Sequence, residues 1–287
     1  MNPSDNAELD FKRGGGYNFR WVIVMNNEIV VESLEEYIKT VNNLRMQGCL
    51  FRGISQKELE PIPSILYSSS DFEVDPKCEW RLENEEKNMK EVIQGVQSVY
   101  PNVDRLTAIE IARHYGFYCR LSDLSEDPLV SLYFVCKDDE EIDGAVHCFN
   151  RTLFSETCLN KQHQGMMDND KFIEIWESIL KDDSTGEFYT KNDGKEELLS
   201  YAYPFLIFPT IQQERITKQR AIFLMWTSLD VMPKEKEYPC HFFDRKIVIR
   251  AKAKAYFRDE IAKLGYDESM LIAKDEKIEE AIRPFLK

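Results

Sequence analysis

The side chains best suited to chemistry gather in one short segment of the chain. Residues 114–123 read His-Tyr-Gly-Phe-Tyr-Cys-Arg-Leu-Ser-Asp, which brings together an imidazole, a guanidinium and a carboxylate. A guanidinium binds phosphate or carboxylate through forked donors, an imidazole moves protons near neutral pH, and a carboxylate accepts a hydroxyl proton. This composition is typical of a pocket for an anionic small molecule.

Two arginines elsewhere in the chain extend this pattern. Arg52 precedes Gly53 in an apolar segment, and Arg215 lies shortly before Gln219. If Arg52, Arg120 and Arg215 converge in the fold, three permanently charged groups form a local anion site even in an acidic protein. Their convergence is the condition on which a nucleotide-binding interpretation depends.

The residues next to these arginines have chemistry of their own. His114 can orient a hydroxyl or shuttle a proton, and Asp123 can hold Arg120 or accept a hydroxyl proton. The ring of Tyr115 can stack on a base or a nicotinamide. A weaker candidate is Cys119, which a neighbouring cation could activate as a nucleophile, although a cysteine is more often an inert small hydrophobe.

The same residues also allow a structural interpretation. Arg52, His114, Arg120 and Asp123 can form a buried polar network that fixes loop geometry, because buried charges must be paired. A binding site requires an open cavity beside such a network, whereas a structural network is sealed. The sequence leaves both interpretations open.

Composition limits the classes of function. The chain has 287 residues, 43% of them hydrophobic, with a formal charge of −14 and a pI near 4.9. This charge disfavours broad nucleic-acid binding, because the summed field repels a phosphate backbone. We find no signal peptide or membrane span, and the seven scattered cysteines are typical of reduced thiols, so we expect a cytoplasmic protein.

Hydrophobic periodicity predicts the elements that position the reactive groups. Strands are predicted at 21–25, 28–31, 49–53, 145–149, 204–209, 221–226 and 246–249, the first two as a hairpin around Asn26 and Asn27. Helices are predicted at 33–48, 79–99, 107–115, 172–180, 252–264 and 274–282, with 79–99 solvated and 107–115 starting in a Thr107–Glu110 capping box. Residues 129–136 are a buried helix or strand, and the segment after Gly116 is expected to be a loop.

These elements mix without regular strand–helix alternation, which predicts an α+β fold. We expect a mixed, mostly antiparallel sheet or sheets flanked by helices. Residues 1–20 are polar and contain a Gly14–Gly16 run, so we interpret them as a flexible lead before a single domain at 21–287. No metal site is predicted, because His147, Cys148, Cys158 and His163 match none of the common zinc spacings.

Three motifs together resemble the FRG-domain family, which is named for an aromatic-Arg-Gly motif. The first reads Phe51-Arg52-Gly53, and the second reads His114-Tyr115-Gly116 followed by Arg120-Leu121-Ser122-Asp123 and Pro128-Leu129. The third, Arg-Ile followed by Gln and a strand, is similar to Arg215-Ile216 with Gln219. Cys119, Ser122 and Ala221 depart from the family's common Thr, Leu and Gly. The signature core extends over about 34–150.

The resemblance implies a family whose biochemical role is largely uncharacterised. An early-strand Arg and a polar late strand are also loosely similar in layout to ADP-ribosyltransferases, which bind NAD between two small sheets. The catalytic Glu of those enzymes has no assured counterpart here, and Gln213, Glu214 and Gln219 are the nearest polar residues. NAD or another nucleotide is therefore a possible ligand, with no cofactor assigned.

We therefore expect a protein with a pocket for a phosphate-bearing small molecule, such as a nucleotide or an NAD-like ligand. The expected chemistry, if any, is transfer or hydrolysis at a nucleotide bond in stress or defence. The candidate catalytic residues are His114, Asp123 and Gln219. The candidate ligand-binding residues are Arg52, Gly53, Tyr115, Arg120 and Arg215. The alternative is a noncatalytic module whose polar network is structural and whose partner is another protein.

Overall fold

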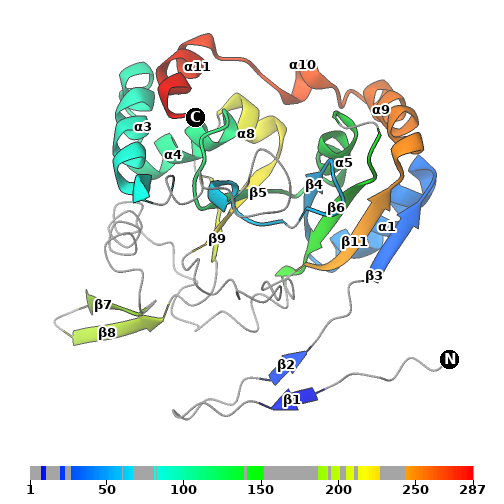
Figure 1. Cartoon of the computed structure of the whole chain (residues 1–287), viewed down its shortest axis with the longest axis horizontal. Helices are drawn as coiled ribbons and strands as arrows, with labels where there is room; N and C mark the ends of the chain where they lie inside the picture. The colour runs from blue at the N-terminus through cyan, green and yellow to red at the C-terminus, as the bar shows by residue number, and fades with distance from the viewer. Residues whose placement is uncertain are drawn as a thin grey trace.

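A seven-stranded mixed sheet lies at the centre of the structure (Figure 1). This computed structural model describes residues 8–10, 20–22, 27–59, 61–66, 81, 83–138, 141–151, 187–192, 195–200, 205–209, 213–226 and 243–286. In sheet order the strands are β3 (Asn27–Val31), β11 (Phe243–Ile249), β6 (Gly144–Phe149), β4 (Leu50–Ile54), β5 (Leu121–Ser125), β10 (Ala221–Met225) and β9 (Phe205–Ile207). Only the β3–β11 pair of this sheet is parallel. The predicted α+β class with a mixed, mostly antiparallel sheet is confirmed.

The helices pack around this sheet in two groups. They are α1 (Leu34–Met46), α3 (Glu85–Val99), α4 (Arg105–His114), α5 (Pro128–Cys136), α8 (Glu214–Lys218), α9 (Lys254–Lys263), α10 (Glu268–Leu271) and α11 (Glu276–Ile282). Short 3-10 turns occur at η1 (Ser64–Leu66), η4 (Ala251–Ala253) and η5 (Arg283–Phe285). Figure 1 shows α3, α4, α8 and α11 together on one side of the molecule, and α1, α5 and α9 on the other side near β6 and β11.

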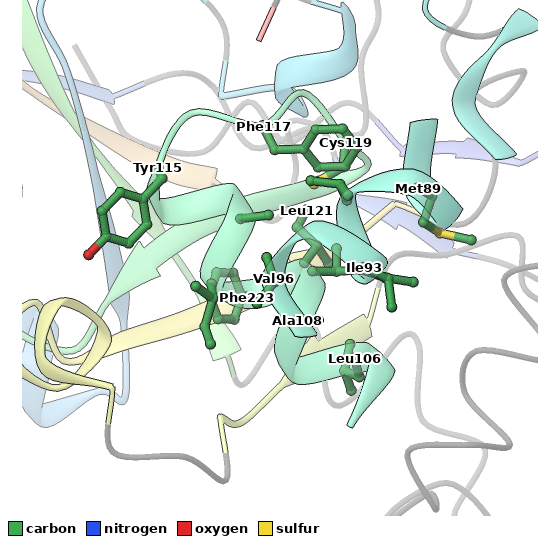
Figure 2. Close-up of a cluster of buried hydrophobic side chains, with 14 of the residues drawn as sticks. Met89, Ile93, Val96, Leu106, Ala108, Tyr115, Phe117, Cys119, Leu121 and Phe223 are labelled. Atoms are coloured by element: carbon green, nitrogen blue, oxygen red, sulfur yellow. The ribbon is translucent and has the colours of Figure 1, made fainter. Parts of the chain in front are cut away.

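Two separate hydrophobic cores lie on one face of the sheet. Residues opposite each other on neighbouring strands point to the same face, and Phe51 is opposite Ser125 while Asp123 is opposite Phe223. Phe51 belongs to the core packed by α1, α5 and α9, and Phe223 to the core packed by α3, α4 and α11. Figure 2 shows part of the second core, with Tyr115 at its edge.

The boundary between the two cores coincides with a weak point in the sheet. Among the described residues, β4 and β5 pair through Phe51 and Ser125 alone, whereas β4 and β6 pair over five residues from Leu50 to Ile54. A third cluster around Leu124, Phe149 and Leu224 covers the opposite face. The two halves of the sheet are thus joined at one end of β4 and β5.

Helix caps follow local sequence chemistry in most places. The Ser33 side chain accepts from the Glu36 backbone N–H and caps α1, as predicted. The predicted Thr107–Glu110 box is wrong: Asp104 caps α4 and accepts from the Thr107 N–H, so the helix starts two residues earlier. Glu110 is instead buried inside the helix.

Gly116 ends α4 in the left-handed conformation that the sequence indicated. Its φ is +99°, a region that residues with a Cβ rarely adopt. Residues 129–136, which periodicity left undecided, form helix α5, with Pro128 at its first turn and Asp127 as its cap. The end of α4 at Gly116 and the start of α5 at Pro128 therefore mark the two ends of the segment that contains Asp123.

Three other predictions require correction. The segment after Gly116 is irregular only at residues 117–120, because residues 121–125 form the inner strand β5. Helix α3 is not solvated, since Met89, Val92 and Val96 are buried against α4 and α11. Residues 21–25 and 28–31 do not form a hairpin: β2 (Arg20–Val22) pairs with β1 (Glu8–Asp10), and β3 pairs with β11.

Each correction has a physical reason. Strand β5 reads Leu-Ser-Asp-Leu-Ser, which lacks the strict polar–apolar alternation that indicates a strand. Strand β3 gains more from burying Val31 beside β11 than from a local turn. Strands β7 (Glu187–Asn192) and β8 (Lys195–Ser200) form their own pair. The predicted helix at 172–180 and most of the predicted lead lie outside the described residues.

Candidate functional site

A cavity of about 560 Å³ lies where the two halves of the sheet separate. Its walls come from β4, β5, the end of α4, α5, α8 and the C-terminal α11–η5 segment. All the predicted site residues except Arg120 line it, although they are spread over more than 160 positions of the sequence: Arg52, Gly53, His114, Tyr115, Asp123, Arg215 and Gln219. Of the three arginines whose convergence the sequence analysis required, Arg52 and Arg215 line the cavity and Arg120 does not.

Arg120 has a different environment. Its side chain is 3% exposed, and its Nε donates to both carboxylate oxygens of Glu85, at 2.8 and 3.0 Å. Glu85 lies at the start of α3, so this buried ion pair ties α3 to the strand that follows Arg120. Two oxygens that flank one donor inside a core are typical of a structural pair. The structure therefore separates Arg120 from the cavity residues.

Asp123 is the carboxylate at the centre of the cavity wall. Its Oδ2 lies 2.6 Å from Nη2 of Arg113, and its backbone carbonyl accepts from Nη1 of Arg52 at 2.9 Å. Burial opposes ionisation of this carboxyl group, but the guanidinium of Arg113, helped by those of Arg52 and Arg215, holds its pKa below the ordinary value. Asp123 is therefore an anion at neutral pH and part of its side chain, 31%, is exposed.

His114 is the acid–base candidate, and it is neutral. Burial lowers the pKa of its imidazole to about 4, against the opposing field of Asp123, and the cations Arg215 and Arg113 lower it further. The ring packs edge-on against Phe223, with centroids 5.3 Å apart. A neutral imidazole can accept a proton at pH 7, which a charged one cannot.

Gln219 positions His114 from the far side. Its side-chain amide hydrogen-bonds the imidazole, and its Nε2 donates to the backbone carbonyl of Leu271 at 2.8 Å. Its own backbone carbonyl accepts from Ser125 Oγ at 2.7 Å. Gln219 is 5% exposed and follows α8, just before Arg220, whose φ of +46° turns the chain into β10. These contacts leave the amide little freedom to act as a catalytic group itself.

Arg215 and Tyr115 form a stacked pair on the cavity wall. The guanidinium carbon of Arg215 lies 5.0 Å from the ring centroid of Tyr115, within cation–π range. The Tyr115 hydroxyl contacts the Ala273 carbonyl and the Gln213 side chain, which fixes the ring. The guanidinium thus covers one face of the ring, so a base could stack only on the opposite face.

Gly53 has a packing role that the sequence did not reveal. A Cβ built at this position would lie 1.9 Å from the backbone oxygen of Ser131 in α5. The helix therefore approaches β4 closely only because residue 53 has no side chain. This close contact sets the position of α5 in the cavity wall.

Several polar lining residues were not singled out from the sequence. Arg113 lies one position before the His-Tyr-Gly motif and pairs with Asp123, while Glu279 and Arg283 come from the C-terminal helical segment. Arg113 is on the same helix end as His114, which is the signal that could have revealed it. Glu279 and Arg283 had no such signal, because only the tertiary fold packs α11 on α3 and brings the C-terminal segment to the cavity.

The described lining is more basic than the chain as a whole. It contains four guanidinium groups and two carboxylates, and its histidine is neutral, so its formal charge is +2 in a chain of −14. The charged lining residues are Arg52, Arg113, Arg215, Arg283, Asp123 and Glu279. A concave basic site of this kind favours small anions.

Buried hydrogen-bonding capacity at this site is left unused. Among the described residues, four buried atoms of the cavity wall have no hydrogen-bond partner: Arg52 Nε, Asp123 Oδ1, His114 Nε2 and Arg215 Nε. Most buried polar atoms in folded proteins are satisfied, because each unsatisfied one costs about 1–3 kcal/mol. The concentration of unsatisfied atoms at one cavity indicates a site that a ligand completes.

Other chemistries find less support among the described residues. Burial raises the pKa of the Cys119 thiol to about 12, which removes the thiolate that a nucleophile requires. Within the described ranges, no group of three His, Cys, Asp or Glu side chains is suited to holding a metal ion. No helix in the part of the chain that the structure describes is long and apolar enough to cross a membrane.

Comparison with known proteins identifies part of the chain. Residues 47–144 match the FRG domain, which includes the Phe51-Arg52-Gly53 and His114-Tyr115-Gly116 motifs. No curated protein and no solved structure matches the chain. The matched region supplies β4, α4, β5 and α5, whereas Arg215, Gln219 and the α11–η5 wall lie outside it.

Proposed function

We propose that this chain, which contains an FRG domain at residues 47–144, binds a phosphate-bearing small molecule of the nucleotide or NAD-like class in the cavity between β4 and β5. The anionic group is bound by Arg52 and Arg215, with Arg113 and Arg283 adding positive charge. Guanidinium groups match phosphate oxygens through paired donors, which a lysine cannot do.

One observation carries this proposal. The Arg215 side chain donates no hydrogen bond to any described residue, although it lies in the wall of a cavity of about 560 Å³. Arg120 shows the opposite arrangement, because its Nε contacts both oxygens of a buried glutamate. In a sealed structural network, both arginine side chains would have hydrogen-bond partners within the protein. The difference supports a role for Arg215 in binding an external anion.

The cavity also supports acid–base chemistry of the expected class. A water molecule beside His114 can give its proton to the neutral imidazole while its oxygen bonds to the electrophilic atom of the nucleotide. The bond to the leaving group then breaks, the leaving group takes the electron pair, and it receives the proton back from the imidazolium. The arginines stabilise the developing negative charge in this proposed hydrolysis.

A thermal-shift screen tests the proposal. The purified protein is heated with NAD, ADP-ribose, ATP, GTP, nucleoside monophosphates and inorganic phosphate, because a ligand that binds the native state raises its apparent stability. We expect at least one phosphate ester to raise the melting temperature. Arg215→Gln should remove this shift without lowering the melting temperature of the unliganded protein.

Arg45→Gln is the matched control, since Arg45 is an exposed arginine at the end of α1 and does not line the cavity. It should leave every shift unchanged. No shift with any ligand, or a shift that survives Arg215→Gln, contradicts the proposal. The first result would favour the alternative in which the domain is a noncatalytic module with a protein partner.

A further inference from the structure

The four unsatisfied atoms in the cavity wall differ in what they require from a ligand. Arg52 Nε and Arg215 Nε are donors, and an anionic oxygen satisfies them. Asp123 Oδ1 belongs to an ionised carboxylate, which accepts hydrogen bonds and donates none. A bare phosphate dianion can therefore satisfy the arginines but not Asp123.

His114 adds a second unsatisfied group. Its Nε2 has no hydrogen-bond partner among the described residues. In a neutral imidazole one ring nitrogen donates and the other accepts. A hydroxyl both donates and accepts, so it can complete Nε2 in either tautomer of the ring.

The two groups are neighbours in the cavity wall. The His114 ring packs edge-on against Phe223, which is the cross-strand partner of Asp123. Arg113 already contacts Oδ2 of Asp123 at 2.6 Å, which leaves Oδ1 for a ligand. A ligand that completes this wall must bring a donor to Asp123 Oδ1 and a second hydroxyl or similar group to His114 Nε2.

We infer that the ligand is a phosphate ester of a sugar with a free vicinal diol, such as the ribose of a nucleotide, with one hydroxyl donating to Asp123 Oδ1 and the other hydrogen-bonded to His114 Nε2. This inference rests on the proposed function and names the substrate class of the same site. The phosphate contacts Arg52 and Arg215.

Base-free probes test the inference by isothermal titration calorimetry. We compare ribose 5-phosphate, 2-deoxyribose 5-phosphate and inorganic phosphate with the wild-type protein at pH 7.5. Loss of a hydroxyl that donates to an ionised acceptor should weaken binding about tenfold or more. Ribose 5-phosphate should therefore bind most tightly and its deoxy analogue at least tenfold more weakly.

Asp123→Asn identifies the acceptor. It keeps the shape of the side chain but removes the charge, so the preference for ribose 5-phosphate over the deoxy analogue should shrink to less than threefold, on the order of a single neutral hydrogen bond. Inorganic phosphate should bind the variant at least as tightly as the wild type, because Arg113 is released from its carboxylate partner. If the variant does not fold, the three wild-type affinities decide the question alone.

The outcomes separate the two proposals. Equal affinities for ribose 5-phosphate and its deoxy analogue, or an affinity for ribose 5-phosphate no higher than for phosphate, overturn the diol inference while the anion site stands. A preference for ribose that persists in Asp123→Asn overturns the assignment of the acceptor. Failure of every phosphate compound in both this series and the thermal-shift screen overturns the proposed function itself.

Discussion

At the scale of single residues, two kinds of buried arginine coexist in this protein. Arg120 contacts both oxygens of Glu85 and stabilises the packing of α3, whereas Arg215 stacks on Tyr115 and has no carboxylate partner among the described residues. Removing one partner of a buried ion pair leaves a charge in a medium that solvates it poorly. Substitutions of the two arginines should therefore have opposite signatures.

We predict that Arg120→Gln destabilises the protein by about 3–5 kcal/mol, since it leaves the Glu85 carboxylate without the guanidinium that contacts both of its oxygens. Arg215→Gln should change the free energy of unfolding by less than about 1 kcal/mol, as expected for a residue without a structural partner. Urea denaturation followed by circular dichroism measures both. Similar losses in the two variants would indicate that Arg215 belongs to a structural network.

His114→Phe tests in a second way whether a residue of the cavity wall binds the ligand or stabilises the fold. The new ring keeps the edge-on packing on Phe223 and eliminates an unsatisfied buried nitrogen, so the melting temperature should stay the same or rise. Binding of ribose 5-phosphate should weaken about tenfold because one hydrogen-bond partner of a sugar hydroxyl is lost. The measurements are a thermal melt and a titration of the same sample. A clear fall in melting temperature would show that the imidazole is structural.

Glu110 makes the stability of the protein depend on pH. Burial raises the pKa of its carboxyl group to about 8, from an ordinary 4.5, so the native state keeps a proton that the unfolded chain releases. Between pH 4.5 and 8 the native state binds more protons, and stability falls as the pH rises, by up to about 1.4 kcal/mol per pH unit.

Glu110→Gln should remove this dependence, because an amide is close in shape to the protonated acid. We expect wild type and variant to be similarly stable at pH 4.5 and the variant to be the more stable at pH 8. Urea denaturation across this range measures the difference between the two proteins, which also cancels the opposite contribution of His114 below pH 6.5. A constant difference at all pH values would mean that Glu110 is not the titrating group.

At the scale of elements, the contact between β4 and α5 sets the width of the cavity. The backbone of α5 approaches β4 so closely at Gly53 that a Cβ would overlap the Ser131 oxygen at 1.9 Å. The glycine of the aromatic-Arg-Gly motif is thus explained by packing, while its arginine faces the cavity. The motif combines one structural and one candidate binding residue.

We predict that Gly53→Ala destabilises the protein by at least about 3 kcal/mol, because neither backbone can move without disrupting its element. Gly95→Ala is the control, since its Cβ would lie 3.1 Å from the Ala281 oxygen and needs only a small shift of α3 against α11. It should cost much less, partly offset by the better helix propensity of alanine. Chemical denaturation ranks the two, and equal effects would argue against a tight β4–α5 contact.

Most elements could be predicted from local signals. The Ser33 cap, the Gly116 terminator and the apolar runs of β6 and β10 each depend on neighbouring residues, which the sequence displays directly. Strand β5 could not be predicted, because Asp123 and Ser125 line a cavity formed by other elements and Ser122 is buried beside Trp226. The pairing of β3 with β11 is likewise a long-range contact without a local signal.

At the scale of the whole molecule, a basic cavity is set in an acidic protein. The chain carries −14, while the described cavity lining carries +2. A small anion can enter the local positive field, whereas an extended polyanion also meets the repulsive charge outside it. The overall charge therefore favours small anions over extended polyanions.

This charge distribution predicts that the protein binds a nucleotide and does not bind a polynucleotide. In fluorescence anisotropy, a labelled 20-nucleotide single strand should not bind at 150 mM salt, and unlabelled adenosine monophosphate should still raise the melting temperature under the same conditions. Binding of the single strand with a steep salt dependence would show that the basic surface extends beyond the cavity. That result would contradict a site for small anions.

The sequence by itself determined the residue types, the family motifs and most local elements. Arg52, His114, Tyr115, Asp123 and Arg215 could be named as candidates because their chemistry does not depend on the fold. Only the tertiary structure decided that Arg120 pairs with Glu85, that Arg113 joins Asp123, and that α11 closes the wall. Such contacts join residues far apart in the chain, and their energies come from burial and charge that exist only once the two cores have packed.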